Sequence, residues 1–167
     1  MKKSLLMTAI ALLGLQVLLS SQNATIPSVD LYTLDGDKIN STKILDNSRP
    51  TILIFWKTFE KDCCSQISSM VDARQEVMGT DNVRIVCICI DCTGKTTHVK
   101  PIVYGKNWDI EAYVDKNGDF KRAMNVVNTP LTILYDTDQS VICQYAGYCS
   151  GAGEMVCEKL KSCIALK

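Results

Sequence analysis

Two runs of consecutive apolar residues dominate the pattern of hydrophobic and polar positions along the chain. Residues 50–56 (PTILIFW) and 83–90 (VRIVCICI) are apolar at almost every position and rich in β-branched side chains. Continuous rather than alternating hydrophobicity predicts strands covered on both faces, as in a parallel sheet. Between them, residues 63–78 carry apolar side chains at helical spacing, which predicts the helix of a strand–helix–strand unit.

Shorter elements are predicted on either side of this unit. Asp35-Gly36 indicates a tight hairpin within residues 30–40, and Ser41 is expected to cap a short helix that ends near residue 46. The second half predicts helices at 96–104, 120–126 and 154–166, and strands at 110–114, 131–135 and 140–146. This order predicts an α/β domain with a mixed central sheet flanked by helices.

Residues 1–24 have the layout of a secretory signal peptide. Lysines at positions 2 and 3 precede an apolar run at residues 5–19, and small residues follow it. The run is shorter than the ~20 residues that a membrane-spanning helix needs. We therefore expect export to the periplasm without stable membrane insertion after cleavage, and a domain at residues 25–167. An uncleaved segment would instead act as an anchor.

Composition narrows the classes of partner and draws attention to cysteine. The 18 basic and 18 acidic side chains balance, and no basic run is present, so we expect no nucleic-acid partner. Nine cysteines are many for a domain that is large enough to form a core without disulfides. Export permits disulfides, and an odd number leaves at least one thiol free or bound to another molecule. The oligomeric state stays open.

Four segments follow one another in an informative order. They are the hairpin DLYTLDGDKI, the strand at 52–56 with Thr58 after it, Val127-Asn128-Thr129-Pro130 ahead of LTILYD, and Gly147 after the last strand. Over residues 27–166 this order resembles the thioredoxin superfamily, and within it the TlpA-type exported thiol–disulfide oxidoreductases. The resemblance implies a thioredoxin-like fold, a cis peptide bond before the proline, protein thiols or disulfides as substrates, and no cofactor. The implied substrate-binding residues are Trp56, Phe59, Glu60, Thr129 and Pro130.

The sequence departs from the family pattern Phe-Trp-x-x-(Trp)-Cys-x-x-Cys at its first cysteine. Glu60 stands at the position of the attacking cysteine, Cys63 matches the second, resolving cysteine, and Cys64 is additional. Amide dipoles in the first turn of a helix favour thiolates, whereas Glu60 and Asp62 oppose them by like-charge repulsion. We therefore predict no strongly acidified thiol. We expect Glu60 to be a surface charge at the start of a helix. The less favoured alternative is a general base that takes a proton from a nearby thiol.

The candidate catalytic residues are Cys63, Cys64, Cys92 and Cys149. The strands that precede them are expected to end at one edge of the sheet, where open α/β sheets carry their sites. We predict that Cys63 or Cys64 cycles with Cys92 or Cys149, since a bridge between adjacent cysteines is strained. The alternative is a redox-inactive thioredoxin-fold module that binds a partner at the cis-proline groove.

The remaining cysteines favour structural roles. Cys87, Cys89 and Cys143 lie in predicted strands and are read as small apolar core residues. Cys157 and Cys163 are read as packing or structural-disulfide residues, and they lie about 9 Å apart along one helix, too far to bridge each other. No metal site is predicted despite His98, because paired Cys-x-x-Cys spacing is missing. The Pro-x-x-x-Thr-x-x-Cys arrangement of peroxiredoxins is also missing.

Overall fold

The computed structural model describes residues 26–45, 47–79, 82–91 and 96–165 of the 167-residue chain. The predicted signal peptide at 1–24 and Cys92 lie outside the described residues. Within the described part, no helix is long and apolar enough to cross a membrane.

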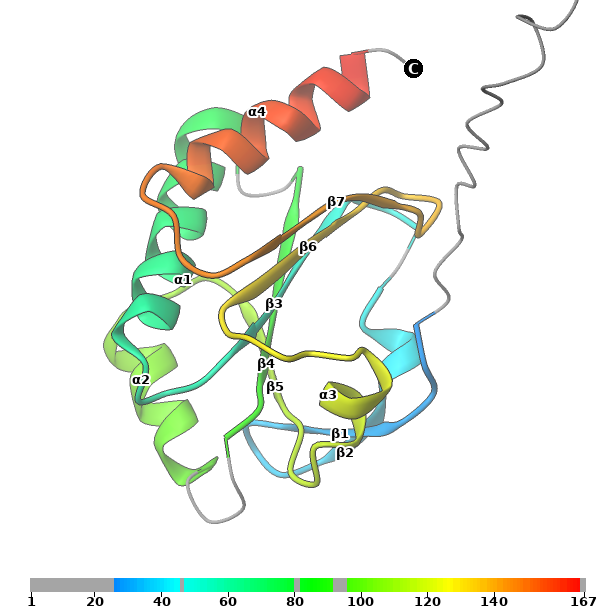
Figure 1. Cartoon of the computed structure of the whole chain (residues 1–167), viewed down its shortest axis with the longest axis vertical. Helices are drawn as coiled ribbons and strands as arrows, with labels where there is room; N and C mark the ends of the chain where they lie inside the picture. The colour runs from blue at the N-terminus through cyan, green and yellow to red at the C-terminus, as the bar shows by residue number, and fades with distance from the viewer. Residues whose placement is uncertain (1–25, 46, 80–81, 92–95, 166–167) are drawn as a thin grey trace, which may run out of the picture.

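A seven-stranded mixed sheet forms the centre of the molecule, in the order β2-β1-β5-β4-β3-β6-β7 (Figure 1). The strands are β1 Asp30–Thr33, β2 Lys38–Asn40, β3 Thr51–Trp56, β4 Arg84–Cys89, β5 Glu111–Val114, β6 Leu131–Tyr135 and β7 Val141–Ala146. β3, β4 and β5 run parallel, whereas β6 is antiparallel to β3, and β7 is antiparallel to β6. The predicted mixed α/β architecture, a thioredoxin-like fold, is confirmed.

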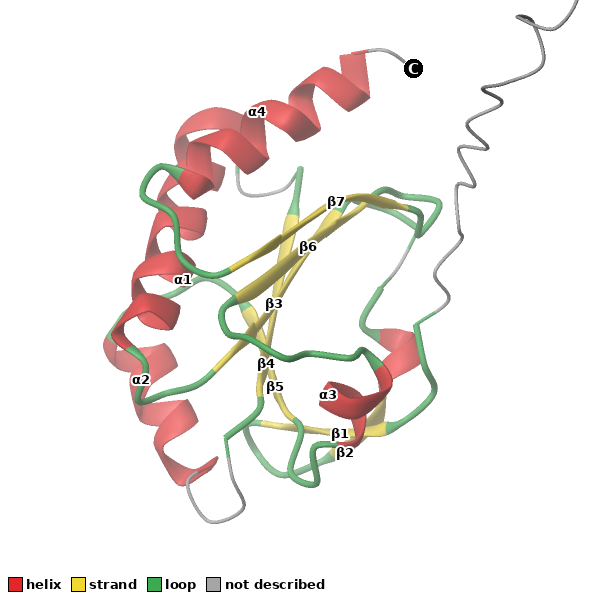
Figure 2. Cartoon of the chain, in the orientation of Figure 1, coloured by secondary structure: helices red, strands yellow, loops and turns green. Residues whose placement is uncertain are grey.

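Helices cover both faces of the sheet (Figure 2). One face carries α1 Lys61–Ala73 with its π-helical continuation η2 Arg74–Met78, α2 Val99–Gly105, which follows the short turn η3 Thr96–His98, and α4 Ala152–Ala165. The other face carries η1 Ser41–Lys43 and α3 Asp119–Ala123. The predicted helices are therefore all present, with ends that shift by a few residues.

The two central strands contribute to a separate core on each face. Along β3, Ile52, Ile54 and Trp56 face the α1, α2 and α4 side, whereas Leu53 and Phe55 face the α3 side. β4 alternates in the same way, with Cys87 and Cys89 wholly buried on the α1 side. Burial on both faces explains why these two runs are apolar at consecutive positions. The prediction that Cys87 and Cys89 are core residues is confirmed.

The expected helix cap at Ser41 is wrong. Asn40 caps η1 instead, because its side-chain oxygen accepts a hydrogen bond from the Thr42 amide at 3.0 Å. The Ser41 hydroxyl is buried, donates to the Pro27 carbonyl at 2.5 Å and accepts from the Val29 amide at 2.9 Å. Ser41 therefore fixes the segment that precedes β1 rather than starting a helix.

Candidate functional site

The N-terminus of α1 faces a cis peptide bond at one edge of the sheet. β3 ends at Trp56, and a short loop leads to Glu60, the N-cap residue of α1, whose carbonyl accepts the amides of Cys63 and Cys64 at 3.1 and 3.3 Å. The Thr129–Pro130 bond is cis, as the resemblance implied. The loop after β3 and the loop before β6 thus meet because β3 and β6 are sheet neighbours.

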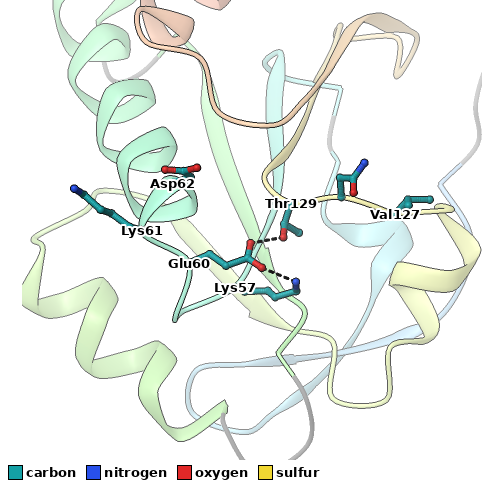
Figure 3. Close-up of a pocket in the computed structure, with 7 residues that line it drawn as sticks. Lys57, Glu60, Lys61, Asp62, Val127 and Thr129 are labelled. Atoms are coloured by element: carbon teal, nitrogen blue, oxygen red, sulfur yellow. Dashed lines mark hydrogen bonds and ion pairs between the residues drawn. The ribbon is translucent and has the colours of Figure 1, made fainter.

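The Glu60 carboxylate holds these two loops together (Figure 3). Lys57 Nζ lies 2.6 Å from Oε1, and the Thr129 hydroxyl donates to Oε2 at 2.5 Å. The Cys63 thiol donates to the same Oε2 at 3.2 Å. Partial burial raises the pKa of Glu60, but these three hydrogen bonds outweigh it and hold the pKa below its usual range. Glu60 lies at the start of the helix as predicted, and its partly exposed carboxylate is held by three hydrogen bonds.

The Cys63 thiol is wholly buried beneath this carboxylate. Burial raises the pKa of Cys63 to about 12, and the nearby Glu60 carboxylate raises this pKa further. The Lys57 amide, which donates to the Cys63 sulfur at 3.5 Å, lowers it. Cys63 is therefore a protonated thiol at neutral pH, in line with the prediction that no thiol here is strongly acidified.

Cys64 lies on a different side of α1 from the Glu60 carboxylate. It is half-buried and lines a cavity of about 520 Å³ together with Tyr148 and Ser150, which flank the exposed Cys149 in the loop before α4. Burial raises the pKa of Cys64, Lys106 lowers it, and Asp91 raises it, with a net increase. The structure therefore brings Cys64 to the Cys149 loop and leaves Cys63 apart from that cavity.

The groove beside the cis-proline contains no sulfur among its described lining residues. Its volume is about 420 Å³, and it is lined by Lys57, Glu60, Lys61, Asp62, Val127, Asn128 and Thr129 (Figure 3). Val127, which lines the groove, is 80% exposed, and Phe59, which precedes Glu60 in the chain, is 62% exposed. The Phe59 ring packs edge-on against His98 at 5.4 Å.

Trp56 does not contact the groove, so the expectation that it binds substrate directly is wrong. Its side chain is wholly buried and packs edge-on against Trp108 at 5.8 Å. The alternation of side chains along β3 explains this orientation, since Trp56 lies on the same face as Ile52 and Ile54. Trp56 belongs to the same core cluster as Cys63.

Asp91 is a site residue that the sequence analysis missed. It follows β4 directly, is 5% exposed, and accepts hydrogen bonds from both the Thr58 amide, at 3.3 Å, and the Thr58 hydroxyl. This contact ties the loop before α1 to the end of β4. A polar residue immediately after a continuous apolar run was the signal that was available.

No disulfide joins the cysteines in the part of the chain that the structure describes. The eight cysteines described there are all free, and no group of three histidine, cysteine or acidic side chains among the described residues is placed to bind a metal ion. The four candidate cysteines thus divide into a buried thiol, a thiol at the cavity, an exposed thiol in the neighbouring loop, and Cys92, which lies outside the described residues.

A mixed sheet covered by helices on both faces, with a helix N-terminus opposite a cis-proline, defines the class of thioredoxin-like proteins. Residues 23–159 match the AhpC/TSA family model. The chain therefore belongs to the AhpC/TSA family.

Solved structures of bacterial proteins share this fold. A thioredoxin-like protein from Porphyromonas gingivalis is 29% identical, with a TM-score of 0.69 over 83% of this chain and 91% of that chain. A secreted Mycobacterium tuberculosis disulfide oxidoreductase homologous to E. coli DsbE is 17% identical, with a TM-score of 0.64 over 78% and 95%. A thiol:disulfide interchange protein from Chlorobium tepidum is 20% identical, with a TM-score of 0.62 over 80% and 93%. No curated protein matches the chain significantly.

Proposed function

We propose that the chain is a thiol–disulfide exchange protein of the cell envelope with a rearranged cysteine site. Membership of the AhpC/TSA family and the disulfide oxidoreductases among the similar structures support redox chemistry on protein thiols or disulfides. The predicted signal peptide and the secreted neighbour from Mycobacterium tuberculosis support export. Glu60 occupies the position of the family's attacking cysteine, so the exchanging thiol has to lie elsewhere.

The placement of Cys64 carries this proposal. A thiolate, not a thiol, attacks a disulfide, and the attacking sulfur must reach the substrate. Cys63 meets neither condition, because it is wholly buried and its pKa is raised to about 12. Cys64 opens onto the cavity whose wall includes the neighbours of Cys149, and Cys149 is exposed. We therefore assign Cys64 and Cys149 as the exchanging pair.

The exchange balances with these two thiols alone. The Cys149 thiolate attacks one sulfur of a substrate disulfide, and the other substrate sulfur leaves and takes up a proton. Cys64 then attacks the mixed disulfide, forms the Cys64–Cys149 bond and releases the second substrate thiol. Two electrons pass to the substrate, and the reverse sequence oxidises a substrate dithiol. The relative reduction potentials of the two pairs set the direction.

Redox titration of the purified chain tests the assignment. The protein is equilibrated in glutathione buffers of graded potential, quenched in acid, alkylated, digested and mapped by mass spectrometry. We expect a reversible Cys64–Cys149 bridge that is lost in Cys64→Ser and Cys149→Ser and retained in Cys63→Ser. A reversible bridge to Cys92 instead would reject this pairing but keep the exchange function. Absence of a reversible bridge at Cys63, Cys64, Cys92 and Cys149 at every potential would reject both the pairing and the exchange function.

The sulfur-free groove favours a second function, redox-inactive binding of a polypeptide. A segment docked beside Thr129 would meet the fixed carboxylate of Glu60 rather than a nucleophilic sulfur, with the exposed side chains of Phe59 and Val127 nearby. Such a module would bind an extended chain through backbone hydrogen bonds and apolar contacts.

An array of cysteine-free peptides distinguishes this function from exchange. Binding that is abolished by Val127→Asp and unaffected by Val141→Asp would locate it at the groove, because Val141 is also exposed but lies on β7. If peptides bind and no thiol changes state in the redox titration, the binding module replaces the exchange protein. Equal loss in both variants would reject the groove as the binding surface.

A further inference from the structure

Cys143 on β7 faces the helical layer that contains α4. Cys143 is the register partner of Leu134 on β6, and Leu134 belongs to the core beneath α1 and α4. Residues directly opposite each other in an antiparallel pair share a face of the sheet. Cys143 is half-buried and packs against that same core. Its thiol is therefore directed toward the helices rather than toward the α3 side.

Cys163 continues the inward stripe of α4. Val156 and Leu160 are wholly buried in the same core, and Cys163 follows them at positions i+7 and i+3 of the helix. Residues at this spacing lie on one face. Cys163 is half-buried, as expected for the point where this stripe reaches the rim of the core.

The electrostatic surroundings of Cys143 place it beneath this last part of α4. Burial raises the pKa of Cys143, Tyr145 and Lys159 lower it, and Cys163 raises it. Lys159 and Cys163 are one helical turn apart, so both act on a thiol that lies under that turn. The strand register, the helical stripe and these charges thus agree in placing Cys143 near the part of α4 that carries Cys163.

We propose that Cys143 and Cys163 form a structural disulfide on oxidation, which pins the end of α4 to the edge strand β7. The structure shows no disulfide at either residue. The bond forms when the thiols of Cys143 and Cys163 release two protons and two electrons. A protein disulfide or a low-molecular-weight disulfide takes up both and is reduced to two thiols. The half-buried positions leave both sulfurs within reach of such an oxidant. This pair shares no cysteine with the proposed exchanging pair.

The other described cysteines of this region are poorer partners for Cys163. Cys157 is wholly buried, its pKa is raised to about 11 by burial, and it lies too far along the same helix to bridge Cys163. Cys149 lies ahead of α4, at the opposite end of the helix from Cys163.

The disulfide would attach α4 to the sheet at a second point, near its C-terminal end. The first turn of α4 is held on α1, where the Gly153 amide donates to the Ser69 hydroxyl at 3.2 Å. A bond from Cys163 to Cys143 closes a loop of roughly 20 residues and constrains the unfolded chain. For a domain of this size, we expect oxidation to raise the Tm by about 10 °C.

Mapping of the oxidised full chain tests the bond. Trypsin releases Cys163 on residues 162–167, and chymotrypsin cuts after Tyr145 and Tyr148, which separates Cys143 from Cys149 and Cys157. After oxidation with oxidised glutathione, we expect the 162–167 peptide to be linked to the peptide that carries Cys143. The link should disappear on reduction, together with the gain in Tm.

Single variants separate this disulfide from the proposed exchanging pair. Cys143→Ser and Cys163→Ser should each abolish the link and the redox-dependent gain in Tm, whereas Cys149→Ser should keep both. If serine on β7 prevents folding, Cys163→Ser near the end of α4 still gives the answer. Alkylation of Cys163 as a free thiol in the oxidised chain, or its linkage to Cys149 or Cys157, would overturn the proposal.

Discussion

Replacing Glu60 with cysteine is predicted to create a faster exchange site in this chain. Glu60 is the N-cap residue of α1, and its carboxylate lies 3.2 Å from the Cys63 sulfur. A sulfur at position 60 would stand at the helix N-terminus, where the dipole stabilises a thiolate. Cys63 would then lie in position to resolve the mixed disulfide formed there. Removal of the carboxylate also removes one cause of the raised Cys63 pKa.

The size of the gain follows from the thiolate populations. The gain is relative to an ordinary thiol. An ordinary thiol with a pKa of about 8.5 is about 3% ionised at pH 7. A helix-start thiol with a pKa of about 7, as in Cys-X-X-Cys sites, is about half ionised, roughly 15-fold more. Because intrinsic nucleophilicity falls with pKa, the rate per thiolate is about fivefold lower. The net gain in the attacking step is about threefold over an ordinary thiol.

The substitution is also expected to carry a stability cost. The Lys57–Glu60 ion pair is more than a third exposed on both sides and contributes about 0–1 kcal/mol. The hydrogen bond from Thr129 to the carboxylate contributes about 1 kcal/mol once solvent exposure is considered. We therefore expect Glu60→Cys to lower the free energy of unfolding by about 1–2 kcal/mol while the fold is kept.

Reduction of insulin by dithiothreitol, followed by turbidity at pH 7, measures the effect. Glu60→Ser is the matched control, because it removes the same carboxylate contacts without adding a sulfur. We expect Glu60→Cys to exceed both the natural chain and Glu60→Ser by about threefold. Equal rates for Glu60→Cys and Glu60→Ser, with both proteins folded and the new thiol titratable, would refute the assignment of position 60 as the attacking position.

Three further predictions concern packing and protonation. Gly153→Ala places a Cβ 2.2 Å from the Ser69 carbonyl oxygen, where α4 meets α1, so it should lower the free energy of unfolding by about 1–3 kcal/mol or more in chemical denaturation. The control Gly105→Ala adds a Cβ that meets nothing within 4 Å and should not destabilise the fold. Equal effects of the two substitutions would contradict the close approach at Gly153. Because its pKa is raised, Cys64 should react with iodoacetamide at a rate that still rises with pH above about 8.5, and a plateau below that pH would contradict the raised pKa. Burial raises the pKa of Cys89 to about 12, so the folded chain keeps this thiol protonated at pH values where the unfolded chain loses the proton. The resulting contribution to the free energy of unfolding is complete below about pH 8.5 and falls by about 1.4 kcal/mol per pH unit toward pH 12. Urea unfolding of Cys89→Ala should show a correspondingly shallower loss of stability between pH 8.5 and 10, and an unchanged slope would reject this account.

The central part of the fold could be predicted from the sequence because its strands are buried on both faces. Continuous runs such as residues 50–56 leave little ambiguity about a covered strand, and the Asp-Gly turn fixed the first hairpin, where Gly36 has a φ of 96°. The cap of η1 was less predictable. Asn40 and Ser41 are both good capping residues, and only the packing of the segment before β1 determines that Ser41 is used elsewhere.

The site was predictable where its contacts are local and unpredictable where they are distant. Lys57 and Cys63 lie within one helical turn of Glu60 in the sequence, whereas Thr129 joins them only because β3 and β6 are neighbours. The burial of Cys63 could have been predicted from apolar periodicity, because Cys63 stands four and seven residues before Ile67 and Met70 on the same face of α1. The cavity beside Cys64 could not, because Tyr148 and Ser150 come from a distant part of the sequence. The family resemblance also implied that Trp56 contacts substrate. Its position on β3 instead directs the side chain into the core, where it is wholly buried.

The two cavities suggest that docking and exchange are separate steps at neighbouring places. Lys61 lines both the cis-proline groove and the cavity of Cys64, so the two surfaces adjoin across the first turn of α1. If a polypeptide docks beside Thr129, its disulfide cannot be attacked there, because the groove offers a carboxylate in place of a sulfur. The reacting sulfur must instead belong to a residue that extends past Lys61 toward Cys64 and Cys149. We infer that the best substrates carry their cysteine a few residues away from the segment that binds the groove, and that peptides with the cysteine at the centre of that segment bind without exchange.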